Sequence, residues 1–134
     1  MDYIAVTKNV KVSPRKVRLV VDGIKKYEVN QVLAYLSLLS QAAAIPVKKT
    51  LESAVANAVN NYKINKGNLV IKKIIVGEGI KYKRYHFAAR GRVRPYKKRS
   101  SHISIVLSEK LESKKMEIKT KEGKAKEVTS GTKS

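Results

Sequence analysis

The stretch from Lys81 to Arg99, KYKRYHFAARGRVRPYKKR, constrains the fold of this chain more than any other. It contains nine Lys or Arg residues, four aromatic residues and no carboxylate. Side chains with this density of charge are almost never buried in a protein core. The runs on either side, LVIKKIIV at 69–76 and HISIVLS at 102–108, are nevertheless typical of strands. The basic stretch therefore connects two strands of a folded domain.

The connection between these strands spans residues 78–100, much longer than the usual hairpin loop of about two to five residues. We predict that the two strands pair as antiparallel neighbours and continue outward together as a long ribbon. With about 11 residues on each arm at roughly 3.3 Å per residue, the ribbon would project on the order of 35 Å. Because an isolated two-stranded ribbon is only marginally stable in water, we expect this one to need phosphate groups along its length.

The overall charge of the chain predicts a polyanionic partner. Its 134 residues include 30 Lys and Arg but only 10 Asp and Glu, a formal net charge of +20. Self-repulsion of this size destabilises a free domain, and nucleic acid is the commonest polyanion that relieves it. We expect no secretory leader and no membrane-spanning segment, because the sequence lacks a sufficiently long apolar run. We expect no membrane-surface partner either, because the helices place their apolar residues where a core needs them. The absence of cysteine excludes disulfides and zinc-thiolate sites.

Hydrophobic periodicity predicts one α+β domain over residues 1–108. A short strand at 3–8 is followed by a helix that Pro14 would begin and the Ser13 side chain would cap. The apolar residues of this helix recur at i, i+3, i+4 and i+7, the spacing of one buried helical face. They are Val17, Val20, Val21 and Ile24.

Two further helices are predicted, one starting after Asn30 and one over about residues 40–62. Proline inside a helix removes a hydrogen bond and crowds the preceding turn, so the third helix should begin or kink near Pro46. Its expected core residues are Val47, Leu51, Ala54, Val55, Ala58 and Tyr62. Residues 109–134 hold eight Lys and five Glu and predict a polar tail, disordered or ordered only on a partner.

The basic residue types suit RNA, because guanidinium groups bind phosphate in a bidentate manner and aromatic rings stack on unpaired bases. A second basic cluster lies at the first strand–helix junction and consists of Lys8, Lys11, Arg15, Lys16 and Arg18. His102 opens a strand, so packing or a single hydrogen bond is its simplest role, but we include it as a candidate. The predicted RNA contacts are Lys11, Ser13, Arg15, Lys16, Arg18, Lys81, Lys83, Arg84, Arg90, Arg92, Arg94, Lys97, Lys98, Arg99 and His102.

Catalysis is not predicted. His86 and His102 are the only imidazoles, and the five carboxylates before residue 109 are scattered singly along the chain. No two of them have the i, i+3 or i, i+4 spacing that would place a pair on one helical face for a metal or for acid–base chemistry. We therefore expect no metal, no cofactor and no small-molecule substrate.

Three stretches resemble the bacterial-type L22 family of large-subunit ribosomal proteins. They are SPRKVRLVVD from Ser13, VKKTLESAVANAVNN from Val47, and the ribbon with its returning strand. The most specific match is a basic residue, four of any kind, then AARGR, nine of any kind, and HISIVL. It runs from Lys83 through Ala88–Arg92 to His102. Ala88 stands where the family usually has Arg or His.

The resemblance implies three helices on a three-stranded antiparallel sheet, seated on the outside of the large ribosomal subunit in the cytoplasm. The ribbon would reach through 23S-type rRNA to line the polypeptide exit tunnel near its constriction. Its implied roles are early subunit assembly and tunnel shaping. Its implied partners are the rRNA, neighbouring large-subunit ribosomal proteins and the nascent polypeptide. The tunnel-lining residues carried over are Tyr82, Lys83, Arg84, Phe87, Ala88, Ala89, Arg90, Gly91 and Arg92.

Two other functions remain open at this point. An architectural DNA-binding protein also uses basic β-ribbon arms with apolar wedges, a part that Phe87 and Pro95 could play. That function predicts a dimer that binds bent duplex DNA tightly. A general RNA chaperone is the weaker alternative, and fixed-stoichiometry sedimentation with the large subunit in high salt would exclude it.

Overall fold

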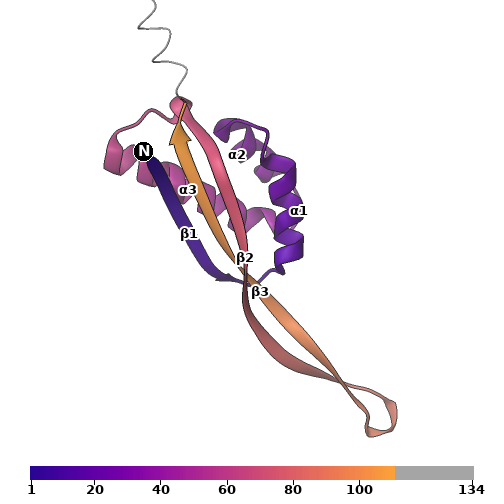
Figure 1. The fold of residues 1–134 in the computed structure, drawn as a ribbon. Coiled ribbons are helices and arrows are strands. Elements are labelled where there is room, and N and C mark those ends of the chain that lie inside the picture. The colour runs from indigo at the N-terminus through magenta and orange to yellow at the C-terminus, as the bar shows by residue number, and fades with distance from the viewer. Residues whose placement is uncertain (111–134) are drawn as a thin grey trace, which may run out of the picture.

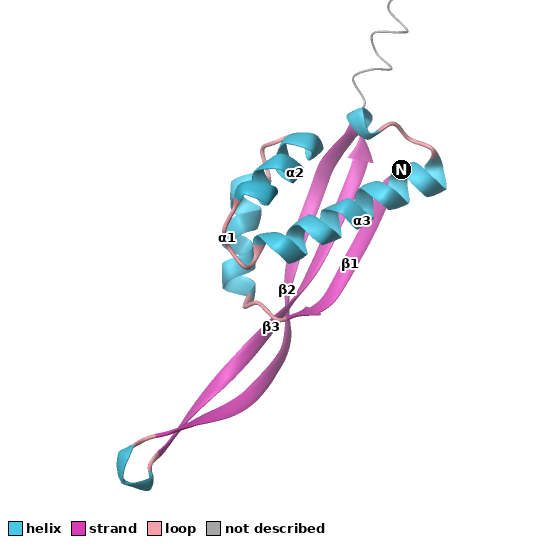
Figure 2. Cartoon of the chain, turned by 180° about the vertical axis from the view of Figure 1, so that it is seen from behind, coloured by secondary structure: helices cyan, strands magenta, loops and turns pink. Residues whose placement is uncertain are grey.

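The fold is built around one long central strand. The computed structural model describes residues 1–110, and its sheet has the order β1–β3–β2 with antiparallel pairing throughout. The strands are β1 (Asp2–Val10), β2 (Leu69–Phe87) and β3 (Val93–Glu109). Three helices cover one face of this sheet, as Figures 1 and 2 show from opposite sides. The predicted α+β class, with three helices on a three-stranded antiparallel sheet, is confirmed.

The helices are α1 (Pro14–Ile24), α2 (Val29–Leu38) and α3 (Ala44–Tyr62), and short 3-10 turns lie at Lys66–Asn68 and Ala89–Gly91. β3 extends one residue past the expected domain boundary at 108, and the backbone N–H of Lys110 donates to the carbonyl of Asn68. The remainder of the expected tail, residues 111–134, lies outside the described residues.

The core lies between the sheet and the helices. Alternate residues of β3 point into it, and Ile103, Ile105 and Leu107 are fully buried, as the period-two pattern predicted. β1 contributes Tyr3 and Ala5 to the same face. The predicted stripe of α1 is buried without exception, and so are five of the six residues predicted for α3. These are Val17, Val20, Val21, Ile24, Val47, Leu51, Ala54, Val55 and Ala58.

Several local predictions are corrected by the structure. The Ser13 side chain makes no cap; instead its backbone carbonyl accepts from the N–H groups of Lys16 and Val17. α2 begins at Val29 rather than after Asn30, because the apolar side chain of Val29 is needed in the core. Tyr62 was predicted to be in the core but is 54% exposed, because it is the last residue of α3. Its ring centroid nevertheless lies 5.0 Å from that of Tyr3.

Pro46 behaves as predicted, because α3 begins close to it. The helix starts at Ala44, which places Pro46 in the first turn, where backbone N–H groups have no partner within the helix. Its carbonyl accepts a hydrogen bond from the buried Thr50 hydroxyl at 2.8 Å. That hydroxyl also lies 2.8 Å from the Thr7 hydroxyl of β1, so α3 is tied to the edge of the sheet.

The sheet narrows abruptly where β1 ends, and we call this region (residues 8–10, 78–80 and 100–102) the neck. Beyond it β2 and β3 continue alone, pairing from Lys81–Arg99 to Phe87–Val93, and we call residues 81–99 the hairpin. The register shifts at the neck on both sides of β3, between Thr7 and Val10 and between Glu78 and Lys81. Such bulges bend a strand and increase its twist, so the hairpin leaves the domain as a twisted ribbon.

Gly79 lies close against Ser100 of the neighbouring strand at the neck. A Cβ on Gly79 would lie 2.5 Å from Ser100 Oγ and 3.1 Å from the Ser100 carbonyl carbon. The Ser100 hydroxyl cannot simply move away, because it donates to the Ile80 carbonyl at 2.7 Å. The bulge therefore requires glycine for space.

We predict that Gly79→Ala destabilises the domain. The added methyl group must displace Ser100, and overpacking of this kind costs about 1–3 kcal/mol of unfolding free energy. Thermal unfolding followed by circular dichroism should show a Tm lower by roughly 4–8 °C for each kcal/mol lost. Gly67→Ala is the control, because its Cβ would meet nothing within 4 Å. Equal Tm values for the two variants would contradict the crowding at the neck.

Candidate nucleic-acid interface

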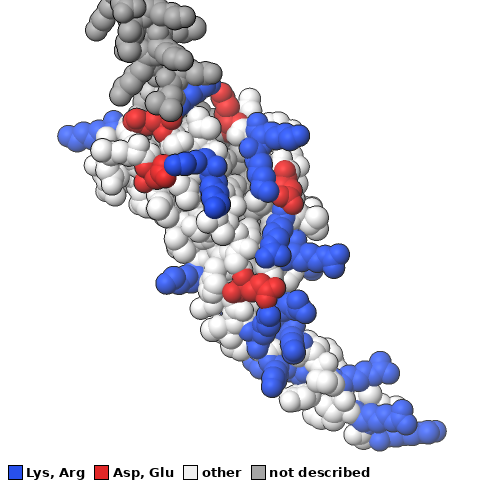
Figure 3. Space-filling view, viewed as in Figure 1, with Lys and Arg blue, Asp and Glu red and all other residues white. Residues whose placement is uncertain are grey.

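Basic side chains extend along the hairpin and around the neck. In Figure 3 the acidic side chains lie on the globular domain and at the neck, whereas the hairpin carries only basic ones. This agrees with the sequence, in which residues 81–99 contain nine Lys or Arg and no carboxylate. The result is a series of basic groups along the hairpin, from the neck to the tip.

Every carboxylate before residue 109 is engaged by a lysine. The five pairs are Lys25–Asp22, Lys48–Glu52, Lys72–Asp2, Lys81–Glu78 and Lys110–Glu28. No arginine forms an ion pair within residues 1–110. Eight of the nine cations in the hairpin therefore lack a carboxylate partner among the described residues, Lys81 being the exception. Their mutual repulsion is left for another molecule to neutralise.

The hairpin has no core of its own. None of residues 81–99 is buried, and only Ala88 and Tyr96 are even half-buried. Phe87, a large apolar side chain next to the turn, is 90% exposed. A two-stranded ribbon without a packed face is marginal in water, so the hairpin gains little stability from its own contacts.

The hairpin aromatics differ in how much of each ring is available. Tyr96 stacks on His86 with centroids 4.2 Å apart, so one of its faces is already occupied. The Arg84 guanidinium lies 5.7 Å from the centroid of the Tyr82 ring. Tyr82, Tyr85 and Phe87 remain exposed and could stack on bases, as predicted for them.

The tip is a tight turn in which two successive residues have a left-handed backbone. Arg90 has φ 60° and Gly91 has φ 68°, and the N–H of Ala88 donates to the carbonyl of Arg92 at 2.8 Å. A Cβ on Gly91 would meet nothing within 4 Å, so glycine is favoured there by conformation and not by space. The turn, from Ala88 to Arg92, lies at the far end of the hairpin (Figure 2).

The structure places the predicted tunnel-lining residues at two levels of the hairpin. Phe87 and residues 88–92 form the tip. Tyr82, Lys83 and Arg84 pair with Lys98, Lys97 and Tyr96, in the half of the hairpin nearer the neck. These two groups would therefore meet different parts of any molecule that surrounds the hairpin.

The basic residues of the first strand–helix junction meet the hairpin base at the neck. Arg15, Arg18 and Arg99 line one hollow together with Ser13, Pro14 and Glu78. The Arg18 guanidinium also donates to the Val76 carbonyl at 3.2 Å. Lys16 instead lies beside Leu19 and the loop before α3. His102 has the simple role expected of it, because its Nδ1 accepts from the Asn9 backbone N–H at 3.0 Å.

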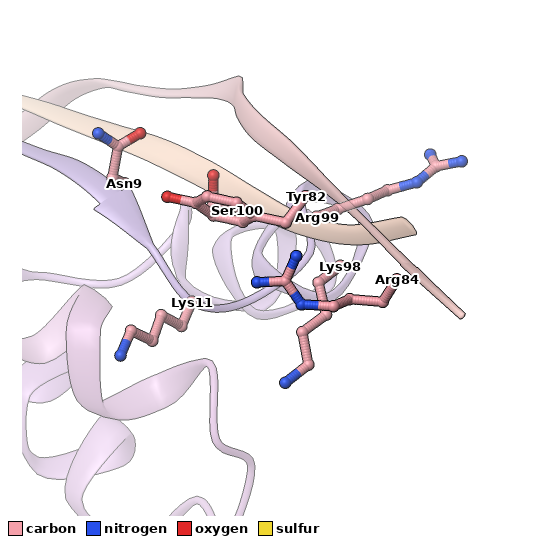
Figure 4. Close-up of a pocket in the computed structure, with 7 residues that line it drawn as sticks. All are labelled: Asn9, Lys11, Tyr82, Arg84, Lys98, Arg99 and Ser100. Atoms are coloured by element: carbon pink, nitrogen blue, oxygen red, sulfur yellow. The ribbon is translucent and has the colours of Figure 1, made fainter. Parts of the chain in front are cut away.

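A second hollow, of about 400 Å³, lies between the end of β1 and the base of the hairpin, and we call it the neck hollow. It is lined by Asn9, Lys11, Tyr82, Arg84, Lys98 and Ser100, with the backbone of Arg99 alongside (Figure 4). Sequence reasoning missed Asn9 and Ser100. The only local signal was that asparagine tolerates a left-handed backbone, which Asn9 adopts with φ 57°.

Glu78 is the one carboxylate at the neck. The hydrogen bond and the positive charge of Lys81, whose Nζ lies 2.6 Å from Oε2, hold the pKa of Glu78 below its usual value. Arg99 and Arg18 lower this pKa further, against an opposing effect of desolvation. Glu78 therefore remains ionised at neutral pH and keeps Lys81 turned toward the neck.

We predict that Lys81→Met returns the pKa of Glu78 toward its usual value, as measured by an NMR titration of the carboxyl carbon. A carboxyl group whose pKa is lowered by folding stabilises the folded state at pH values above its unfolded-state pKa. The small contribution of the Lys81–Glu78 pair to the free energy of unfolding should therefore disappear as the pH falls through the pKa of Glu78 in the folded protein. Lys83→Met is the matched control, because Lys83 does not contact Glu78. An unchanged Glu78 titration in Lys81→Met would contradict the pairing.

The described part of the chain shows no other kind of site. Within residues 1–110, no three His, Cys, Asp or Glu side chains come together as potential metal ligands. None of the helices in this range is long and apolar enough to cross a membrane.

Comparison with known proteins identifies the family. Residues 5–108 match the family described as ribosomal protein L22p/L17e. The chain is also 45% identical, over 108 residues, to the large ribosomal subunit protein uL22 of Oceanobacillus iheyensis, covering 81% of this chain and 96% of that relative. The family match spans the neck and the whole hairpin. The chain belongs to the L22p/L17e family of ribosomal proteins.

Proposed function

We propose that this protein is a structural component of the large ribosomal subunit in the cytoplasm and that it binds 23S-type rRNA through the hairpin and the neck. One observation carries the proposal. The hairpin holds nine cations, eight of them without a carboxylate partner among the described residues, and it buries none of its side chains. A protein segment of this kind becomes well ordered when another molecule supplies both the counter-charge and the packing.

RNA supplies both. Its phosphates neutralise Lys and Arg and release counterions, which makes binding strongly salt-dependent. Its unpaired bases can pack on the exposed rings of Tyr82, Tyr85 and Phe87. The arginines are the better phosphate ligands because the guanidinium group is planar and bidentate, and within residues 1–110 none of them is paired with a carboxylate.

The domain and the hairpin would have separate tasks in this arrangement. The domain packs its own core and would stay at the surface of the subunit, beside neighbouring ribosomal proteins. The hairpin would pass between rRNA segments, hold them together during assembly, and present residues 87–92 to the polypeptide exit tunnel and the nascent polypeptide. Tyr82, Lys83 and Arg84 would line the tunnel wall at a different level, in accordance with their place nearer the neck.

Hydroxyl-radical footprinting of 23S-type rRNA tests this proposal. The intact protein should protect nucleotides around the tunnel, and a variant lacking residues 82–98 should lose those protections while keeping the ones that the domain makes. Unchanged protections would assign RNA recognition to the domain alone. Binding of bent duplex DNA in place of rRNA would favour an architectural DNA-binding protein, in which the exposed Phe87 would act as a wedge.

We predict that Arg90→Ala combined with Arg92→Ala weakens rRNA binding without destabilising the domain. Both side chains lie at the tip, far from the core, so Tm should stay nearly unchanged. Loss of two phosphate contacts should reduce the slope of log K against log salt concentration by about 1–2. Lys25→Ala with Lys26→Ala, at the end of α1 away from the neck, is the control and should leave the slope unchanged. A large fall in Tm with unaltered RNA affinity would contradict the proposed role of the tip.

A further inference from the structure

The neck hollow gathers three cations from separate parts of the chain. Lys11 comes from the segment after β1, Arg84 from β2 and Lys98 from β3. Figure 4 shows the Arg84 guanidinium near the ring of Tyr82, whereas the side chains of Lys98 and Lys11 extend away from that ring, Lys11 on the side of the domain. None of the three cations forms an ion pair among the described residues, and no carboxylate lines the hollow. The site therefore favours an anionic ligand.

The hollow also offers a flat apolar surface. The side chain of Tyr82 is 47% exposed although it lies at the base of the hairpin, and the Arg84 guanidinium is 5.7 Å from its ring centroid. A ring beside a guanidinium group stacks well on a nucleobase, because every base has a π-face and arginine adds a cation–π contribution. A bare inorganic anion would use the cations and leave this surface exposed.

Contacts within the neck hold the backbone segments that surround the hollow. Ser100 donates to the Ile80 carbonyl, and the backbone N–H of Asn9 donates to His102. Gly79 packs closely against Ser100, which fixes the separation of β2 and β3 at this level. The volume of about 400 Å³ is within the usual range of small-ligand sites, roughly 300–1,000 Å³. The neck therefore fixes the backbone around the hollow, and the exposed side chains of Tyr82, Arg84 and Lys98 complete its walls.

We infer that the neck hollow binds a single unpaired nucleotide of RNA, with the base against Tyr82 and Arg84 and the phosphate between Lys11 and Lys98. A base within a duplex is stacked on both faces, so only an unpaired base could reach the Tyr82 ring. Because Lys11 belongs to the domain and the other groups to the hairpin, the bound nucleotide fastens one to the other. This inference rests on the proposed RNA-binding function and specifies the kind of RNA that the neck selects.

The test is an NMR titration of the full chain with three probes of equal length. They are a six-nucleotide single-stranded RNA, the same ribose-phosphate oligomer without bases, and a six-base-pair duplex. The Tyr82 ring signals should shift with the single strand alone, whereas the Lys11 and Lys98 signals should shift with the base-free oligomer as well. Shifts of Tyr82 with the duplex, or none with any probe, would overturn the inference.

Substitution of Tyr82 gives a second, independent measurement. Tyr82→Leu should weaken binding of the single strand between about fivefold and 150-fold, since it removes one stacked base, and should leave the affinity for the base-free oligomer unchanged. Tyr27→Leu is the matched control, because Tyr27 is also exposed but lies at the end of α1 away from the neck. Equal single-strand affinities for the two variants would overturn the inference.

The nucleotide site in the neck hollow and the rRNA-binding function of the whole protein can be tested separately. If Tyr82→Leu and the combination of Lys11→Ala with Lys98→Ala leave the footprint on 23S-type rRNA intact at the neck, the nucleotide site is wrong and the rRNA-binding function stands. If the unaltered protein gives no footprint on this rRNA, the proposed function itself is wrong, whatever the six-nucleotide strand does.

Discussion

Packing of the inner face of β3 against the helices is the interaction on which the rest of the structure depends. Ile103, Ile105 and Leu107 are fully buried, and β3 lies between β1 and β2 and pairs with both. The same strand continues past the neck as one arm of the hairpin. The hydrophobic effect therefore acts at one end of β3 and positions the charged end, which has no core to stabilise it.

The sequence predicts well those elements that depend on local pattern. The apolar stripe of α1, the alternation in β3 and the start of α3 near Pro46 follow from helix and strand periodicity and from proline chemistry, and the structure confirms them. The side-chain cap at Ser13 and the start of α2 after Asn30 were wrong. For α2, burial of Val29 in the core outweighed the local preference for a cap at Asn30.

The neck could not be predicted, because its form depends on register between distant segments. Bulges on both sides of Ser100–His102 require pairing with β1 and with β2, and neither shift leaves a pattern in the local sequence. The neck hollow likewise combines residues near positions 10, 83 and 99. Its basic residues were predicted as RNA contacts one by one, but their convergence around Tyr82 appears only in the folded chain. The RNA contacts themselves remain predictions.

The continuity of β2 and β3 through the neck has a mechanical consequence. Their ladder runs from Leu69–Glu109 in the domain to Phe87–Val93 beside the turn, with bulges but no break in pairing. A pull on the tip along the ribbon acts on both strands in the same direction, so it does not slide one strand past the other, and the perpendicular hydrogen bonds between them carry little of the load. A drag on the tip would thus be transmitted as tension along the backbone of both strands into the packed core, which anchors the hairpin although the hairpin has no core of its own.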